Sequence, residues 1–209
     1  MSRPDREKWD RRYREGAYST RKHPSALLME WLPKLAIDAE TPRAIDLACG
    51  IGRNTLYLAQ QGWRVNAVDI SGVALEKLAA AATDDLDVHC TEMDLETGQP
   101  WPADLMAAGP FDLALMIRYT NLHLVGRVLE ILQPGGYLLA EAHRVTEAAV
   151  AGPGGARFRE APGALRAAAA GYEMMEYREG IVDDPDGRPV DLAQMLCRRP
   201  PGRSHARSK

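Results

Sequence analysis

The sequence has 209 residues, of which 45% are hydrophobic and 26% are charged, and its formal net charge is -3. This length and composition are typical of one soluble globular domain with a sizeable core. The small negative charge excludes a strongly basic protein that would attract nucleic acid or an anionic membrane over long range. Three cysteines without a C-x-x-C pair indicate neither a disulfide framework nor a zinc site, so no metal is expected.

Several features of the sequence indicate the cellular compartment of the protein. Residues 1–14 mix acids and bases and contain no apolar core of a secretory signal. No apolar run approaches the roughly 20 residues that a membrane span needs. We therefore expect a cytoplasmic protein with reduced thiols and no membrane partner. The tail 200–209 is polar and basic, and we expect it to be disordered.

Hydrophobic spacing predicts alternating helices and strands over the first two thirds of the chain. Apolar residues recur at helical spacing over 27–35, within a segment, 1–40, that we expect to form a helical cap. Short buried strands are predicted at 44–48, 64–69, 87–94, 111–117 and 137–142. Helices are predicted between them at 54–61, at 72–82 with Ser71 as the N-cap, and at about 121–132. This order predicts a doubly wound parallel sheet.

The sequence changes character after the fifth predicted strand. Residues 148–163 are rich in glycine, proline and alanine and predict a mobile loop, and 165–170 predict a short helix. Two strand-like segments, 172–182 and 189–198, flank "DDPDGR", which predicts a terminal β-hairpin. We therefore expect an α/β fold in a single domain, 1–199. Its core is a Rossmann-like doubly wound sheet of about seven strands, mostly parallel with a C-terminal antiparallel hairpin.

A glycine-bearing turn follows the first predicted strand, in the segment "AIDLACGIGRN". In an open parallel sheet, ligands bind outside the carboxyl ends of the strands, near the point where strand order reverses. Gly50 and Gly52 remove Cβ atoms there and permit backbone conformations that are closed to other residues. Asp69 ends the next predicted strand and brings a carboxylate beside this bare turn. The pair suits a ribose with two vicinal hydroxyls, and it predicts a cofactor that contains a nucleoside.

The spacing of the turn narrows the choice of cofactor. A dinucleotide fingerprint would need glycine at Thr55, and the P-loop pattern is absent. Asp94, in "EMDLE", ends the third predicted strand and adds an acid that could bind an adenine amino group. Asp46, Asp69 and Asp94 are thus expected at the ends of three adjacent strands.

These features resemble the class I S-adenosylmethionine-dependent methyltransferases. Their motif D-x-G-x-G-x-G corresponds here to Asp46–Gly52, with Ala48 in place of the first glycine, and "LQPGGYLLA" is similar to their turn into the fifth strand. The resemblance implies S-adenosylmethionine as the cofactor, ribose binding at Asp69, and adenine binding at Asp94 with Leu95. The expected cofactor-binding residues at the strand ends are Asp46, Ala48, Cys49, Gly50, Gly52, Asn54, Asp69, Ile70, Asp94, Leu95 and Arg118.

Three blocks resemble the TehB-type tellurite-resistance methyltransferases in particular. They are "STRKHPSALL", "CGIGRNTLYLAQQGW" and the C-terminal stretch 165–198, and the resemblance covers nearly the whole globular part. It implies methyl transfer by direct in-line displacement to a small-molecule acceptor. The implied acceptors are thiol-like compounds, selenium or tellurium oxyanions, or related metabolites.

The resemblance also points to candidate catalytic residues. The subfamily carries a His-Arg pair and a later arginine on the terminal hairpin, over the acceptor site. Here Gly180 and Ile181 stand at the positions of the pair, and Arg188 matches the later arginine. Arg21 and His23 precede the first predicted helix and are further candidates, because they could close over the donor's carboxylate or over the acceptor.

Two hypotheses of different kinds stay open on the sequence alone. The first is an enzyme that methylates a small molecule. The second is a non-catalytic cofactor-binding module that acts through a partner, which the substituted Ala48 and the missing His-Arg pair keep open. An RNA-modifying enzyme is less favoured, because residues 117–120 are not an N-P-P-Y-type tetrad and the chain is not basic. We expect no nucleic-acid partner, and a monomer or homodimer.

Overall fold

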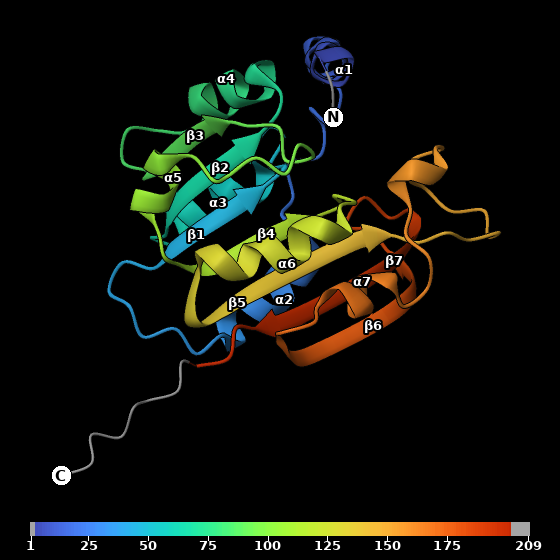
Figure 1. Cartoon of the computed structure of the whole chain (residues 1–209). Helices are drawn as coiled ribbons and strands as arrows, with labels where there is room; N and C mark the ends of the chain where they lie inside the picture. Colours follow the sequence, from blue (N-terminus) through green and yellow to red (C-terminus); the bar gives the residue numbers. More distant parts are fainter. Residues whose placement is uncertain (1–2, 202–209) are drawn as a thin grey trace.

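A seven-stranded sheet forms the centre of the protein in a computed structural model that describes residues 3–201 (Figure 1). The strand order is β3-β2-β1-β4-β5-β7-β6. The strands are β1 (Arg43–Leu47), β2 (Arg64–Asp69), β3 (Val88–Glu92), β4 (Phe111–Ile117), β5 (Leu132–His143), β6 (Glu173–Asp183) and β7 (Pro189–Arg198). The strands β1 to β5 pair in parallel, whereas β7 pairs antiparallel with both β5 and β6. The predicted fold is therefore confirmed.

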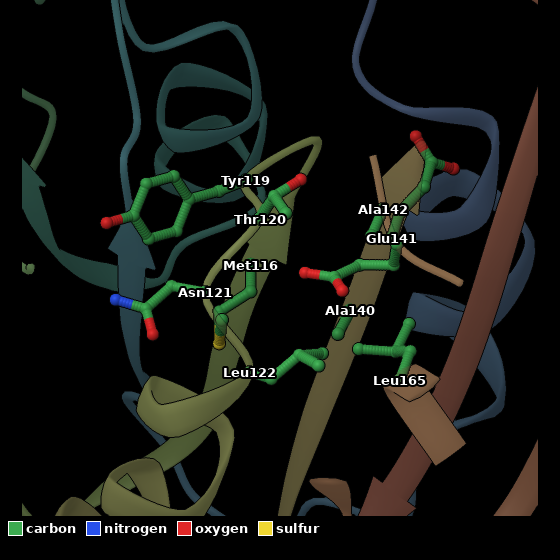
Figure 2. A pocket seen from close by; sticks show the side chains of 10 residues that line it. Met116, Tyr119, Thr120, Asn121, Leu122, Ala140, Glu141, Ala142 and Leu165 are labelled. Atoms are coloured by element: carbon green, nitrogen blue, oxygen red, sulfur yellow. The ribbon is translucent and has the colours of Figure 1, made fainter. Parts of the chain in front are cut away.

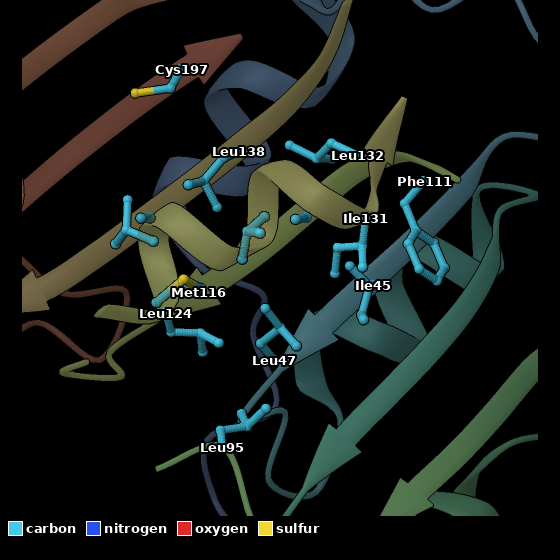
Figure 3. Close-up of a cluster of buried hydrophobic side chains, with 14 of the residues drawn as sticks. Ile45, Leu47, Leu95, Phe111, Met116, Leu124, Ile131, Leu132, Leu138 and Cys197 are labelled. Carbon is cyan, nitrogen blue, oxygen red and sulfur yellow. The ribbon is translucent and has the colours of Figure 1, made fainter. Parts of the chain in front are cut away.

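Helices cover both faces of this sheet. They are α1 (Arg3–Arg14), α2 (Ala26–Trp31), α3 (Arg53–Gln60), α4 (Gly72–Ala81), α5 (Ala103–Ala108), α6 (Leu122–Ile131) and α7 (Ala164–Ala168), with 3-10 turns at Leu32–Lys34 and Ala156–Phe158. One buried cluster joins the sheet to α2 and α3. The other joins the opposite face to α5, α6 and α7, and Figure 3 shows its side chains between the strands and α6. The core thus has two apolar layers, as a doubly wound sheet requires.

Most predicted elements begin and end within a few residues of the observed ones. Strand β5 starts at Leu132 rather than at Tyr137, because the Pro134-Gly135-Gly136 turn is accommodated by a register irregularity against β4. Helices α1 and α5 were not predicted individually, although α1 falls in the expected helical cap. The predicted disordered tail lies outside the described residues from 202 onward. Within residues 3–201, no helix has both the length and the apolar character to cross a membrane.

The topology brings six chain segments to one edge of the sheet. The parallel strands β1 to β5 all end there, and β7 begins there because it runs in the opposite direction. Strand β1 lies between β2 and β4, so the strand order reverses at its carboxyl end. This is the place where open α/β sheets bind ligands.

Candidate functional site

A pocket of about 1060 Å³ opens at this carboxyl edge. Strand ends form its floor, and three segments cover them: α1 with the chain that follows it to Arg21, the loop 151–158, and the start of β7. Small-molecule sites usually measure about 300–1,000 Å³. The pocket therefore has room for a nucleoside cofactor and a second small molecule together.

Most of the residues expected to bind the cofactor line this pocket. They are Ala48, Cys49, Gly50, Asn54, Asp69, Ile70, Leu95 and Arg118. Asp94 is not among the lining residues, although its neighbours Met93, Leu95 and Glu96 are. The Asp94 Oδ1 atom accepts a hydrogen bond of 2.9 Å from the Glu96 amide, which shapes the loop after β3.

The other two residues expected to bind the cofactor, Asp46 and Gly52, do not line the pocket and instead contact the helices next to the turn. The buried Asp46 carboxylate accepts a hydrogen bond of 2.7 Å from the Thr55 hydroxyl, and burial raises the pKa of Asp46 to about 6. A Cβ on Gly52 would collide with the side chain of Leu78 in α4. Gly52 thus permits close packing of α3 and α4, whereas Gly50 is the glycine that faces the pocket.

The turn after β1 keeps a left-handed backbone in spite of its alanine. The φ angles are 57° at Ala48, 58° at Gly50 and 80° at Gly52. An L-residue in this region costs about 1–2 kcal/mol. Ala48 therefore adopts a left-handed conformation of the kind that glycine adopts most readily.

Asp69 holds two neighbouring turns together. Its Oδ2 accepts a hydrogen bond of 2.8 Å from the Gly50 amide, and its Oδ1 accepts one of 2.9 Å from the Ser71 amide. Burial raises the pKa of Asp69, while these backbone bonds oppose the rise. An ionised carboxylate has about four acceptor positions, so these backbone hydrogen bonds do not exhaust the acceptors of Asp69, which lines the pocket. The remaining acceptors suit the hydroxyls of a ribose.

Helix α1 forms a wall of the pocket that the sequence did not reveal. The hydroxyl of Tyr13 lies 2.8 Å from the position that a Cβ on Gly50 would occupy. Asp10 anchors the helix, because its Oδ1 accepts a hydrogen bond of 2.6 Å from the Ser71 hydroxyl at the start of α4. The amine of Lys77 also donates to the carbonyl oxygen of Tyr13. Figure 1 shows α1 beside α4.

A buried charge cluster forms the opposite side of the pocket, around Arg118. This residue follows β4 with a φ of 60°. Its Nε donates a hydrogen bond of 2.7 Å to Glu141, and its Nη1 donates one of 2.8 Å to Asp184. Glu141 also borders a second cavity (Figure 2), which is too tight to admit a water molecule. The cluster thus rests on closely packed side chains.

Two of the three candidate catalytic residues join this cluster. The guanidinium of Arg21 lies 3.0 Å from Asp184 and 2.9 Å from Asp186, and Arg188 lies 2.8 Å from the same Asp186 oxygen. Both arginines line the pocket. His23 does not line it: its side chain is exposed, and its carbonyl oxygen accepts a hydrogen bond of 3.0 Å from Arg53.

Gly180 and Ile181, at the positions where the resemblance implies a His-Arg pair, lie on the edge strand β6. They pair with β7 and are not among the residues that line the pocket. In this chain the hairpin therefore reaches the pocket through the turn and the start of β7, at Arg188 and Val190.

Two further pocket residues were missed in the sequence. Arg53 begins α3 and has no carboxylate within 4 Å among the residues that the structure describes, and burial and nearby Arg118 lower its pKa. His143 ends β5, is 6% exposed, and has a buried Nδ1 without a hydrogen-bond partner. Burial, followed by Arg118, lowers the pKa of His143 to about 4, so the imidazole is neutral at pH 7. Each is adjacent to a predicted strand or turn, which is the signal that could have identified it.

The sequence of residues 44–136 matches the family described as "Methyltransferase domain". The chain contains a methyltransferase domain. The match covers β1 to the start of β5, including the glycine turn and the ends of β2 and β3. The expected methyltransferase family is thereby confirmed for this part of the chain.

Solved structures share the fold of this methyltransferase domain. TehB from Haemophilus influenzae superimposes with a TM-score of 0.67 at 23% identity, over 88% of this chain and 66% of the TehB chain. Magnesium protoporphyrin IX methyltransferase from Synechocystis, solved with bound S-adenosylmethionine, has a TM-score of 0.56 at 14% identity, over 82% and 77% of the two chains. At these identities the likeness concerns the fold.

A curated relative is more similar in sequence. Hemagglutinin 1 from Eikenella corrodens is 31% identical over 173 residues, which are 76% of this chain and 55% of the relative. The chain thus spans little more than half the length of that relative. The methyl acceptor and the partners of this protein are therefore not inferred from that relative.

Proposed function

We propose that the protein transfers a methyl group from S-adenosylmethionine to a small-molecule acceptor. The observation that carries the proposal is that one pocket is lined both by the glycine turn with Asp69 and by the arginine cluster around Arg118. The first set offers a nucleoside site, and the second offers polar groups for another molecule. Transfer of a methyl group between two small molecules requires that both are held in the same pocket.

The residues at the strand ends fit the cofactor. Gly50 leaves open backbone where a side chain would intrude, and Asp69 offers acceptors for ribose hydroxyls. The apolar side chains of Ile70, Met93 and Leu95 line the part of the pocket that would receive the adenine. Arg53, a pocket cation without a carboxylate partner among the described residues, suits the carboxylate of the methionine part.

When it is bound, S-adenosylmethionine supplies a methyl group that is already activated by its sulfonium. The chain's own contribution is therefore orientation, which can be worth effective molarities of about 10⁵–10⁸ M. Arg21 and Arg188 would hold the acceptor from the hairpin side. Cys49 provides no nucleophile, because burial and the nearby acids raise its pKa well above the ordinary value and keep it as a thiol.

A titration tests the proposal directly. The purified protein is titrated calorimetrically with S-adenosylmethionine, with S-adenosylhomocysteine, and with NAD as the control. We expect both adenosyl ligands to bind and NAD not to bind. The protein is then incubated with S-adenosylmethionine and candidate acceptors, beginning with small thiols and selenite, and the release of S-adenosylhomocysteine is measured. Failure of both adenosyl ligands to bind would overturn the proposal, and binding without turnover of any acceptor would favour the non-catalytic binding module.

The proposal includes a cytoplasmic setting and a monomer or homodimer. The described cysteines, Cys49, Cys90 and Cys197, are all free thiols, as in a reducing compartment. Light scattering coupled to size exclusion measures the oligomeric state, and a fluorescent fusion reports the location.

A further inference from the structure

The part of the pocket that is lined by α1, by the segment after it and by the loop 151–158 contains aromatic rings and cations. We call it the outer compartment, and define it by Lys8, Trp9, Arg12, Tyr18, Arg157 and Phe158, all of which line the pocket. The first three belong to α1, and the last two belong to the loop 151–158. The Arg157 guanidinium lies 3.0 Å from Asp5, so the two walls are joined by an ion pair.

Cations lie against the aromatic faces on both walls. The guanidinium carbon of Arg12 is 4.8 Å from the ring centre of Trp9 and 5.6 Å from that of Tyr18. Across the compartment, the amine of Lys8 is 5.4 Å from the ring centre of Phe158. These cations cover one face of each ring, so a flat ligand ring would contact the aromatic side chains by an edge or by the other face, and the cations would attract an anionic substituent of the ligand ring.

The charges of the outer compartment are not balanced, in contrast to those of the inner cluster. In the inner cluster, the guanidiniums of Arg21, Arg118 and Arg188 are matched by the carboxylates of Asp184, Asp186 and Glu141. Lys8 and Arg12 form no ion pair with a carboxylate in the described part of the chain. Two positive charges one helical turn apart therefore face the pocket uncompensated.

The size of the pocket also indicates how large a methyl acceptor it can hold. A thiol of a few atoms, or a single oxyanion, would be held by the inner cluster and would leave the outer compartment to water. Water gains little from aromatic faces, whereas a ligand ring buries apolar surface there at about 25 cal/mol per Å². The outer compartment is thus better matched to a larger acceptor.

We propose that the methyl acceptor is a flat aromatic carboxylate that also bears a nucleophilic substituent, such as a thiol, which would take the methyl group from the sulfonium, lose its proton to solvent and leave S-adenosylhomocysteine as the second product. The acceptor's ring lies among Trp9, Tyr18 and Phe158, and its carboxylate lies beside Lys8 and Arg12. The proposal rests on the proposed function, since it concerns the second molecule of the same pocket. It differs from a thiol or oxyanion acceptor of a few atoms in requiring both the ring and the charge.

Three probes that share a thiol separate the ring from the charge. Protein saturated with S-adenosylhomocysteine is titrated calorimetrically, in the presence of a phosphine reductant, with 4-mercaptobenzoate, thiophenol and 3-mercaptopropionate. We expect 4-mercaptobenzoate to bind at least about tenfold more tightly than either of the others, and its affinity to fall with added salt. Equal affinities, or no binding of 4-mercaptobenzoate, overturn the proposal.

Matched variants locate the binding to the outer compartment. We expect Arg12→Gln and Lys8→Gln each to weaken 4-mercaptobenzoate binding by about tenfold and to leave thiophenol unchanged, as expected for the loss of a charge-assisted contact. Arg11→Gln is the control, because Arg11 is exposed on the same helix and does not line the pocket. Equal effects of Arg11→Gln and Arg12→Gln would contradict the placement.

The titration with S-adenosylhomocysteine keeps the two proposals apart. If the wild-type protein does not bind it, the proposed function fails. If it binds but shows no preference for the aromatic carboxylate, only the inference about the acceptor fails. Retained affinity for S-adenosylhomocysteine in the Lys8 and Arg12 variants shows that their pocket is still folded.

Discussion

The Oδ2 atom of Asp69 accepts a hydrogen bond of 2.8 Å from the amide of Gly50, which joins the end of β2 to the turn after β1. The other carboxylate oxygen accepts from Ser71 at the start of α4. One buried side chain therefore organises two turns that face the pocket. Its removal leaves two amides without their partner, at a cost that is largest where no water can replace it.

Replacement of this carboxylate tests its double role. We expect Asp69→Ala to weaken binding of S-adenosylhomocysteine about tenfold to hundredfold, since hydrogen bonds to charged groups contribute about 1.5–3 kcal/mol. Calorimetry on the folded variant measures the effect. Asp87→Ala is the matched control, because Asp87 precedes β3 at the opposite edge of the sheet and pairs with the exposed Arg64. An unchanged affinity in Asp69→Ala would mean that the ribose assignment is wrong.

The contact between Tyr13 and Gly50 predicts a paired effect. Gly50→Ala would place a Cβ 2.8 Å from the Tyr13 hydroxyl, on a backbone with a φ of 58°. We expect it to lose most cofactor affinity, because either α1 or the turn must move. Tyr13→Phe removes the hydroxyl, and the next ring atom is 3.6 Å away. The double variant should therefore recover part of the affinity, and calorimetry on the four proteins measures the coupling. Additive effects would contradict the contact.

Arg53 gives a prediction about one part of the cofactor. If its guanidinium holds the methionine carboxylate, Arg53→Gln should weaken S-adenosylmethionine binding by about tenfold. It should leave 5′-methylthioadenosine unaffected, since that ligand lacks the carboxylate. Arg64→Gln serves as the control at the far edge of the sheet. Equal losses for both ligands would indicate that Arg53 supports the turn rather than the carboxylate.

The sheet and the turn could be predicted because their signals are local. Continuous apolar runs identify the buried strands, and Ser71 caps α4 as expected, with its hydroxyl accepting from the Ala74 amide. The glycine turn was placed correctly for the same reason, although Gly52 proved to be a packing position. The sequence alone could not divide the roles of Gly50 and Gly52, because that division depends on Leu78 and Tyr13 from other elements.

The walls of the pocket could not be predicted, because they depend on contacts between distant segments. Arg21 meets Asp186 across 165 positions of sequence, and Arg157 meets Asp5 across 152. The charged side chains of α1 suggest a solvent-exposed helix, and only the fold reveals that Trp9 and Tyr13 line the pocket. Asp184 and Asp186 are predicted only as residues of the hairpin turn, because their contacts with the arginines depend on the fold. The three-dimensional cluster, rather than any motif, identifies them.

Ala48 provides a prediction about stability. Its left-handed φ of 57° costs about 1–2 kcal/mol, which glycine would relieve, although the larger unfolded-state entropy of glycine would offset part of that gain. We expect Ala48→Gly to raise the free energy of unfolding by about 0.5–1 kcal/mol, measured by urea denaturation, and to retain cofactor binding. Ala59→Gly, in the interior of α3, is the control and should lower it by about 1 kcal/mol. A loss of stability in Ala48→Gly would contradict the observed turn.

Two buried groups predict opposite effects of pH on stability. Burial raises the pKa of Asp46 from 3.8 to about 6, so between these values the folded protein keeps a proton that the unfolded chain loses. The free energy of unfolding therefore falls as pH rises through this window, by about 3 kcal/mol at 1.36 kcal/mol per unit. For His143 the pKa falls from 6.5 to about 4, so there the unfolded chain holds the extra proton. Its contribution rises with pH over nearly the same window, and the two partly cancel in the wild-type protein.

Single substitutions should separate these two contributions. Asp46→Asn keeps a carbonyl oxygen that can accept the Thr55 hydroxyl but no longer titrates. Relative to the wild type, we expect its stability to increase steadily from pH 4 to pH 6.5. His143→Gln removes the opposite contribution, so its stability relative to the wild type should decrease over the same range. Urea denaturation at pH 4.5, 5.5 and 6.5 measures both differences. If the free energies of unfolding of both variants change with pH in parallel with that of the wild type, burial does not shift the pKa values of Asp46 and His143 in the stated directions.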